Sequence, residues 1–402
     1  MWSRFLNDRR GGAVPMFAFA VVPLIGVVGA AVDYSRASAA RSAVLATLDA
    51  TALMLSRDAA NMTDAQISAK AESMFKAQFT RTDVSGLTVT ALKTSPQAGS
   101  FTLTVSAAGT VSTTFSRLLG KDKTDIASSA DVKWGVKKLE LALVLDNTGS
   151  MSNNGKMTEL KSASKNLLTT LQAAAKQPGD VKVAIIPFDK IVNVGTTYAS
   201  SGWVNFAANN IQQSSWQGCV QDRDQPNDVQ DTVPGTSSST KFPAVNCSGI
   251  TSIMTLTDVL DTTGFTNLNA KIDAMNPSGN TNVTIGLVWG WHALTTGLPL
   301  DQASAPAPDK DKVIVLLTDG DNTQNRWTTS GSSIDARTAL ACTNAKAANI
   351  KIYTVRVIDG DANLLRTCAS KTNMYYEVNQ ASELNNVFSS IAQNLANLRI
   401  AK

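Results

Sequence analysis

Residues 139–151 read LELALVLDNTGSM, and this stretch decides the fold. Its first seven residues are apolar apart from one glutamate, which is typical of a strand buried on both faces of a parallel sheet. The strand ends in Asp146, and Thr148 and Ser150 follow at alternate positions. Because ligand sites in open α/β sheets lie outside the carboxyl ends of strands, we expect these three side chains to face one pocket. We expect Asp146 to be buried behind it, where a carboxylate needs a cation or hydrogen bonds to remain charged.

Strands and helices alternate along the rest of the C-terminal part. After the first strand, an apolar stripe from Leu160 to Leu171 predicts a helix. The later predicted helices lie near 270–275, 283–294, 334–348 and 362–369 and from 384 onward, and the later strands lie at 181–187, 313–317, 350–357 and 375–378. This alternation predicts an α/β fold with a doubly wound, mostly parallel sheet over residues 137–402.

A second apolar strand ends as the first does. Residues 313–320 read VIVLLTDG, so that Asp319 lies at the strand end before a turn glycine. Thr281 lies in a polar loop that leads into a predicted helix. Hard oxygen ligands of these kinds suit Mg²⁺, or Mn²⁺ in its place. The candidate metal ligands are Asp146, Thr148, Ser150, Thr281 and Asp319; the alternative is an α/β domain whose polar strand ends bind nothing.

The order and spacing of these five residues resemble the metal-ion-dependent adhesion site of the von Willebrand factor type A family. That family has serine where Thr148 stands, and threonine keeps the hydroxyl while adding a methyl group. The resemblance covers residues 137–400 and implies a Rossmann-like fold. It also implies a divalent metal with an open position, filled by an acidic side chain of a protein partner, and therefore adhesion.

Composition excludes several other functions. The net charge of the 402-residue chain is +4 and its basic residues are scattered, so nucleic-acid binding is not expected. The one histidine, His292, lies in a predicted helix, where we expect it on the surface or partly packed. A catalytic triad or a zinc cluster would have to use it, and no general base or activated nucleophile is evident near the metal ligands. We expect no enzyme, although metal-bound water is a route to hydrolysis.

The four cysteines, without CxxC spacing, suit two disulfides in an oxidising compartment. Of the three connectivities we prefer the sequence-local pairs, Cys219–Cys247 and Cys342–Cys368. The alternative is four buried free thiols, since cysteine is readily buried in any core.

Residues 198–250 do not fit the alternation of strands and helices. They are rich in Ser, Asn, Gln, Asp, Gly and Pro, and a loop of this length is usually functional or disordered. The pair Cys219–Cys247 would close them, and aromatic residues such as Trp203 and Trp216 give them a core. We interpret them as an insertion on the surface of the α/β domain.

Residues 13–32 read AVPMFAFAVVPLIGVVGAAV and carry no charge. A helix of about 20 residues, at about 1.5 Å each, spans a hydrocarbon core of about 30 Å. Three arginines precede this stretch and Asp33 is the first charge after it, so the positive-inside rule predicts a cytoplasmic N-terminus at residues 1–12. The alternative is a cleaved signal peptide, with Ala30 and Ala31 small enough for the cleavage site.

Residues 33–134 predict a small α+β unit on the same helix. The helix continues to about residue 58, and a capping box at residues 63–66 starts a second helix that ends near 79. Alternating patterns near 87–91 and 101–105 predict strands, with a third strand near 126–134. A long apolar helix carrying a small sheet is similar to a pilin.

The segments RRGGAVPMFA (9–18) and VGAAVDYSR (28–36) resemble the bacterial TadE/TadG-like pilus assembly family. The chain departs from pseudopilins, which have a glutamate five residues beyond the processing glycine; counted from Gly12, that position is Phe17. We therefore expect the segment to remain as an anchor.

The two resemblances together imply a single-pass protein of the bacterial inner membrane whose C-terminal domains lie in the periplasm. The expected function is adhesion or assembly in a tight-adherence (Flp) pilus system, with a partner that is another pilus or secretion component. The alternatives are a secreted or surface adhesin, which requires cleavage after the span, and a structural scaffold with a vestigial metal site.

Overall fold

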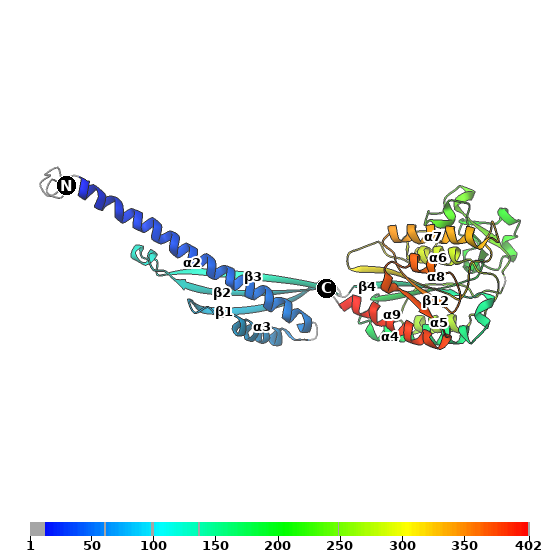
Figure 1. The fold of residues 1–402 in the computed structure, drawn as a ribbon, viewed down its shortest axis with the longest axis horizontal. Helices are drawn as coiled ribbons and strands as arrows, with labels where there is room; N and C mark the ends of the chain where they lie inside the picture. The colour runs from blue at the N-terminus through cyan, green and yellow to red at the C-terminus, as the bar shows by residue number, and fades with distance from the viewer. Residues whose placement is uncertain (1–12, 60–61, 98–99, 136, 248, 401–402) are drawn as a thin grey trace. The chain divides into compact units, whose positions relative to one another are not determined.

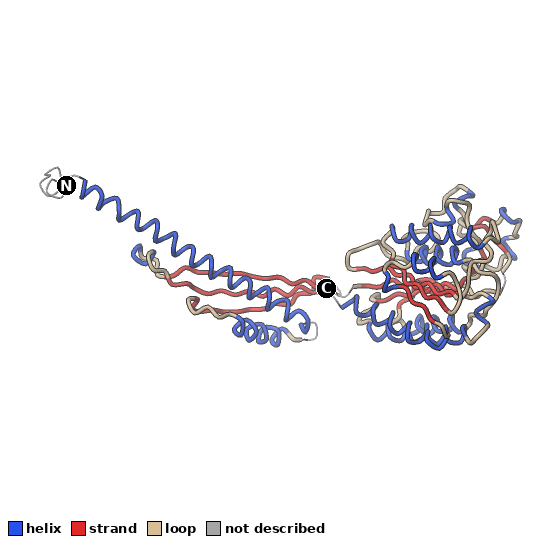
Figure 2. Tube along the Cα trace, in the orientation of Figure 1, coloured by secondary structure: helices blue, strands red, loops and turns tan. Residues whose placement is uncertain are grey.

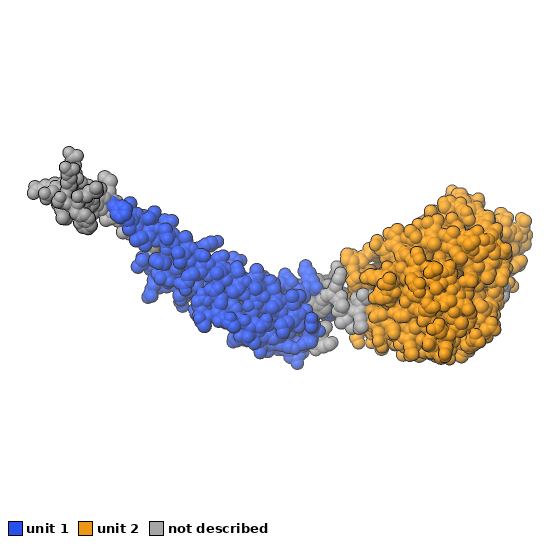
Figure 3. Space-filling model, viewed as in Figure 1, with its two compact units in different colours: residues 1–135, 402 blue, residues 136–401 orange. Residues whose placement is uncertain are grey.

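The computed structural model describes residues 13–59, 62–97, 100–135, 137–247 and 249–400. The predicted cytoplasmic segment, residues 1–12, lies outside this part of the chain. Two compact units make up the molecule, residues 1–135 with 402 and residues 136–401 (Figure 3).

The N-terminal unit is built on one long helix. Helix α2 (Ala13–Ala59) and helix α3 (Asp64–Gln78) pack on an antiparallel sheet of β1 (Val84–Gln97), β2 (Ser100–Ser112) and β3 (Lys123–Gly135), in that order (Figure 1). The predicted capping box is present: the Thr63 hydroxyl accepts from the Gln66 amide at 3.3 Å, and the Gln66 side chain accepts from the Thr63 amide at 2.9 Å. The core side chains include Leu48, Phe75 and Leu103, all fully buried.

From Phe17 onward, the N-terminal part of α2 exposes large apolar side chains. The helix is long and apolar enough to cross a membrane by length and composition. Its exposed apolar residues include Phe19, which is 83% exposed, and Val27, which is 70% exposed. A contiguous apolar surface of this kind needs a membrane or a partner to cover it. A signal sequence fits the same description, so the choice between anchor and cleaved signal stays a prediction.

The C-terminal unit has the predicted α/β fold. Its main sheet consists of β4 (Lys138–Asp146), β5 (Val181–Phe188), β10 (Met254–Asp258), β11 (Lys310–Thr318), β12 (Lys351–Val357) and β13 (Tyr375–Val378). The strand order is β10-β5-β4-β11-β12-β13, and every pairing is parallel except that of β10 with β5. The strands run through the middle of this unit, with helices on either side (Figure 2). Sequence analysis missed β10, because this short edge strand is only half-buried and carries a weak apolar signal.

Helices cover both faces of this sheet, which makes it doubly wound. Helices α4 (Lys156–Ala174), α5 (Thr262–Asp273) and α9 (Leu384–Ile400) lie on one face, and α6 (Val283–Leu294), α7 (Gly331–Ala347) and α8 (Ala362–Cys368) lie on the other (Figure 1). Two glycines let α6 approach the sheet closely. A Cβ atom at Gly290 would lie 2.4 Å from Val144 Cγ2, and one at Gly286 would lie 2.5 Å from Phe188 Cγ. This contact fixes the N-terminus of α6 beside the strand ends.

The predicted insertion at 198–250 is folded. Short strands β6 (Val192–Asn193), β7 (Val204–Asn205), β8 (Cys219–Val220) and β9 (Phe242–Val245) form a small sheet in the order β6-β8-β9-β7. Trp203, Trp216 and Phe242 are buried in it, and Phe206 is partly buried against the same core. Both preferred disulfides are confirmed: Cys219–Cys247 closes the insertion, and Cys342–Cys368 joins α7 to α8.

His292 is fully buried, which corrects the expectation of a surface or partly packed residue. The insertion covers this face of α6, with the Phe242 ring 5.3 Å from the imidazole. The Nη2 atom of Arg223 lies 3.3 Å from Nε2 of His292. Because a guanidinium only donates, Nε2 must accept and the imidazole is neutral. Burial, and then the charge of Arg223, lowers the pKa of His292 well below 6.5.

A His292→Gln variant should show a weaker loss of stability on acidification than the wild-type protein. The unfolded chain binds a proton at this histidine near pH 6.5, whereas the folded chain resists it, so the unfolded state holds more protons below that pH. The free energy of unfolding therefore falls by up to about 1.4 kcal/mol per pH unit as the pH drops from about 6.5. Urea unfolding of both proteins at several pH values measures the difference. Parallel pH profiles would contradict the assignment.

Candidate metal centre

The two strands that carry the predicted carboxylates are neighbours. Strands β4 and β11 pair in parallel with Leu145 opposite Leu317, so Asp146 and Asp319 emerge at the same edge of the sheet. Asp146 is fully buried, and Asp319 is 1% exposed. The burial of Asp146 agrees with the expectation from the sequence.

A chain of hydrogen bonds connects the β4 residues to Asp319. Asp146 accepts from the Thr148 amide at 2.8 Å and from the Thr318 hydroxyl at 2.6 Å. The hydroxyls of Thr148 and Ser150 lie 3.0 Å apart, and Ser150 Oγ donates to Asp319 Oδ1 at 2.6 Å. Thr148 is buried and takes part in this network, so the threonine that replaces the family's serine fits.

Thr281 reaches the same place from the loop before α6. Its amide donates to the Thr323 hydroxyl at 2.8 Å, and its carbonyl accepts from the Thr323 amide at 2.9 Å. A Cβ atom at Gly320 would lie 3.6 Å from Ser150 Oγ and 3.9 Å from Thr281 Oγ1, so both hydroxyls flank that glycine. The fold therefore brings all five predicted residues together.

Sequence analysis missed a sixth residue, Lys156. Its ammonium lies 2.8 Å from Asp319 Oδ2 and 3.6 Å from the exposed carboxylate of Asp359, and its side chain is only 3% exposed. A lysine is expected at the surface unless a partner pairs with it. The partner of Lys156, Asp319, is distant in the sequence, so the residues around Lys156 gave no signal for this position. The left-handed turn at Asn154 and Gly155 starts α4 at this lysine and directs it toward the strand ends.

The electrostatics of the centre favour a cation. Burial, and then the charge of Asp319, raise the pKa of Asp146 to about 6, against the effect of its hydrogen bonds from Thr148 and Thr318. Two buried carboxylates repel each other unless positive charge lies between or beside them. Lys156 supplies one such charge.

The donor set fits a hard divalent cation. Two carboxylates and three hydroxyls are oxygen ligands of the kind that Mg²⁺ and Mn²⁺ accept, with water completing the shell. Across the described residues no group of three or more His, Cys, Asp or Glu side chains is placed to hold a metal, so binding here would depend on the hydroxyls. The ammonium of Lys156 would oppose an incoming cation.

The insertion is attached to the loops of this centre through Asp222. Its buried carboxylate accepts from Asn282 Nδ2 at 2.9 Å and from the Arg326 amide at 3.1 Å. Burial raises the pKa of Asp222 to about 6. Asn282 follows Thr281, and Arg326 lies in the loop after Asp319, so one carboxylate holds two of the site loops. The polar composition of the insertion gave no signal for this role.

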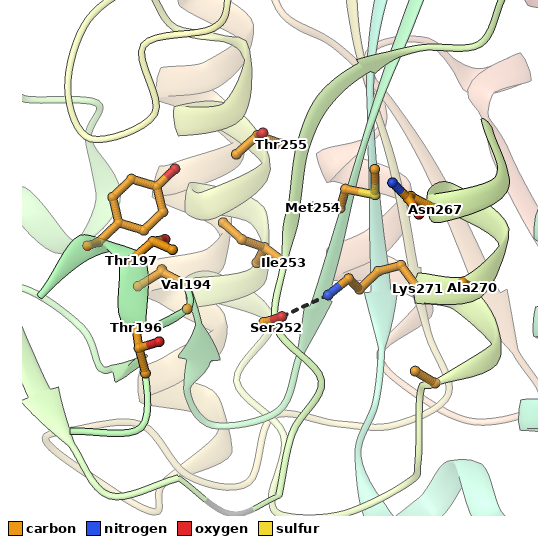
Figure 4. Close-up of a pocket in the computed structure, with 13 residues that line it drawn as sticks. Val194, Thr196, Thr197, Ser252, Ile253, Met254, Thr255, Asn267, Ala270 and Lys271 are labelled. Atoms are coloured by element: carbon orange, nitrogen blue, oxygen red, sulfur yellow. Dashed lines mark hydrogen bonds between the residues drawn. The ribbon is translucent and has the colours of Figure 1, made fainter. Parts of the chain in front are cut away.

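A pocket with a volume of about 650 Å³ lies elsewhere on the C-terminal unit, and residues 194–198, β10 and α5 line it (Figure 4). Lys271 reaches across it and donates to the Ser252 hydroxyl at 2.8 Å. None of the five predicted ligands lines this pocket, so the candidate centre is separate from it.

Two family models match the chain. The Flp pilus-assembly TadE/G-like model matches residues 11–57, and the von Willebrand factor type A domain model matches residues 237–390. The second match begins after β4, so the Asp146–Ser150 segment is placed in the centre by the fold. No curated protein matches the sequence.

Several solved structures are similar to the chain at low identity. The pilus adhesin SpaC from Lactobacillus rhamnosus GG is 14% identical with a TM-score of 0.43, covering 77% of this chain and 34% of its own. The vWF domain of the type V pili tip protein Mfa5 from Porphyromonas gingivalis is 13% identical with a TM-score of 0.42, covering 66% and 97%. Proximal thread matrix protein 1 from the mussel byssus, with a zinc-occupied MIDAS motif, is 14% identical with a TM-score of 0.36, covering 65% and 48%. This chain thus spans about a third of the length of SpaC.

A Lys156→Met variant should bind Mg²⁺ and Mn²⁺ more tightly than the wild-type protein. Removing a buried positive charge beside Asp319 should raise the affinity by about tenfold or more, which corresponds to about 1.4 kcal/mol. Calorimetric titration of the full chain in detergent measures this change.

Lys165→Met is the matched control for that titration. Lys165 lies on the same helix and pairs with Asp273, but its side chain is 38% exposed, so its removal should leave the metal affinity unchanged. Equal affinities in the wild-type protein and the Lys156→Met variant would show that the lysine does not oppose the metal.

Proposed function

We propose that this chain, which joins a TadE/G-like segment to a von Willebrand factor type A domain, is a membrane-anchored adhesion module of a Flp pilus system. The observation that carries the proposal is the convergence of Asp146, Thr148, Ser150, Thr281 and Asp319 at one edge of the sheet. These residues come from three separate segments of the chain, and together they place two carboxylates and three hydroxyls in one centre. The centre binds Mg²⁺, or Mn²⁺ in its place.

The charge of the metal-bound centre supports an acidic partner. Asp146 and Asp319 neutralise a divalent cation, and the ammonium of Lys156 then leaves one positive charge in a largely buried site. The exposed Asp359 offsets little of it, since water screens that carboxylate. A carboxylate from a protein partner completes the neutralisation and occupies the metal's open position. Another pilus or secretion component is the proposed source.

We infer that the centre lies outside the cytoplasm, and three observations support this. Helix α2 carries the uncharged stretch 13–32, in which large apolar side chains such as Phe19 and Val27 are exposed. Basic residues precede the stretch, so the positive-inside rule places the N-terminus in the cytoplasm and both folded units in the periplasm. The two disulfides fit an oxidising compartment.

The second candidate function is a metal-independent scaffold. The observation that favours it is Lys156, whose ammonium already pairs with Asp319 and so stabilises the carboxylates without a metal. An enzyme is a weaker candidate. The hydroxyls and carboxylates of the centre are hydrogen-bonded to one another, and the one histidine, on α6, is buried in the protein core.

An Asp146→Asn variant should lose metal binding by more than about 100-fold, because it removes a ligand charge while an amide oxygen can still accept from Thr148. The full chain in detergent is titrated with Mg²⁺ and Mn²⁺, and is then used to capture partners from membrane extracts with and without chelator. Capture that requires metal and is lost in the variant supports adhesion. Asp273→Asn, which changes a carboxylate that is 55% exposed, is the matched control. A flat isotherm for the wild-type protein would contradict metal binding and would favour the metal-independent scaffold.

A further inference from the structure

The loop between β2 and β3 is fixed to helix α2 at the end of the apolar stretch. Asp33, the first charged residue after that stretch, accepts from the amides of Thr114 at 2.9 Å, Phe115 at 2.9 Å and Ser116 at 2.7 Å. Arg36 donates to the Thr114 hydroxyl at 3.0 Å. These bonds hold the start of the loop at the level of Asp33.

The loop reaches beyond Asp33 along the apolar part of the helix. A Cβ atom at Gly29 would lie 2.4 Å from Phe115 Cβ and 2.5 Å from Phe115 Cγ, so the Phe115 side chain packs where this glycine leaves space. Gly29 precedes Asp33 by four residues, or about 6 Å along a helix. Phe115 therefore lies beside the uncharged stretch and not beside the polar part of α2.

The outer side of this loop is apolar and uncovered. Leu118 is 82% exposed and Phe115 is 38% exposed, and Tyr34 on the adjoining turn of α2 is 76% exposed. Contact between water and such large apolar side chains is unfavourable. An aromatic residue and a leucine at the end of an apolar helix are typical of the boundary between hydrocarbon and headgroups.

The charges around these apolar residues match an anionic lipid surface. Arg117, Lys121 and Lys123 are exposed in or beside the loop, and two exposed acids lie near them: Asp122, which pairs with Arg117 at 3.3 Å, and Asp125 on β3, so that one positive charge remains in excess. Basic residues are attracted to the phosphates of an anionic membrane surface. The loop is closed at its base, since the Thr113 amide donates to the Asp122 carbonyl at 3.0 Å, so its apolar and basic residues are presented together.

We propose that residues 114–119 form a second membrane contact, in which Phe115 and Leu118 enter the outer interface of the bilayer beside helix α2. Arg117, Lys121 and Lys123 then face the lipid phosphates. The inference rests on the proposed membrane anchor and adds to it. Two contacts, a helix and a loop bonded to it through Asp33, fix the depth and rotation of the N-terminal unit at the membrane surface.

A single fluorescent label at position 118 tests this contact. All four native cysteines are in disulfides, so Leu118→Cys introduces the one free thiol of the chain. Because Leu118 is so exposed, the substitution should not disturb folding. The full chain is labelled with an environment-sensitive dye and reconstituted in vesicles of phosphatidylethanolamine and phosphatidylglycerol, with spin-labelled lipids as quenchers.

Two further positions serve as references. Leu92→Cys places the dye on β1, at a leucine that is 57% exposed and distant in sequence from the apolar stretch. Val27→Cys places it on the apolar stretch itself, where the valine is 70% exposed. We expect strong quenching at position 27 by lipids labelled deep in the chain, strong quenching at 118 by lipids labelled near the headgroup, and little at 92.

The outcomes separate the loop from the anchor. Quenching at 27 with none at 118 would overturn the loop contact and leave the anchor intact. A blue-shifted but unquenched dye at 118 would also overturn it, since protein would then cover the loop. No quenching at 27 would overturn the anchor and, with it, the loop contact.

Discussion

The burial of two carboxylates at one edge of the main sheet is the constraint on which the C-terminal unit depends. Asp146 and Asp319 have lost most of their hydration, and each needs positive charge or hydrogen-bond donors in its place. Backbone amides, hydroxyls and the ammonium of Lys156 supply these. These groups stabilise the carboxylates in the absence of a metal. The hydroxyl oxygens keep free lone pairs with which they could also coordinate one.

In the proposed function, Lys156 would have two opposite consequences. Its ammonium beside Asp319 would weaken the attraction of the carboxylates for a divalent cation, and it would leave a metal-bound centre positive, so that an acidic partner would gain more from binding. One side chain would then lower the affinity for the metal and raise the affinity for the partner. Such a centre would bind its metal most tightly when the partner is bound, since the metal and the partner would each raise the affinity for the other.

The insertion and the close packing of α6 determine where the loops of the centre lie. Gly286 and Gly290 let α6 approach the sheet, which positions Thr281 just before the helix. Asp222 then joins the Thr281 loop to the loop after Asp319 from the side of the insertion. The disulfide Cys219–Cys247 stabilises this arrangement from within the insertion. The insertion therefore acts as a support for the site loops and also as a cover for His292.

The fold class, the five oxygen-bearing residues, the preferred disulfide pairs and the apolar stretch could all be predicted from the amino-acid sequence. These depend on local signals: apolar runs that end in polar residues, cysteine spacing and the absence of charge. Only the tertiary structure decided that Lys156 faces Asp319, that Asp222 holds two loops and that the insertion buries His292. Each of these contacts joins residues distant in the chain, and a polar residue in a polar segment has the same local pattern whether it is buried against a charge or exposed to water.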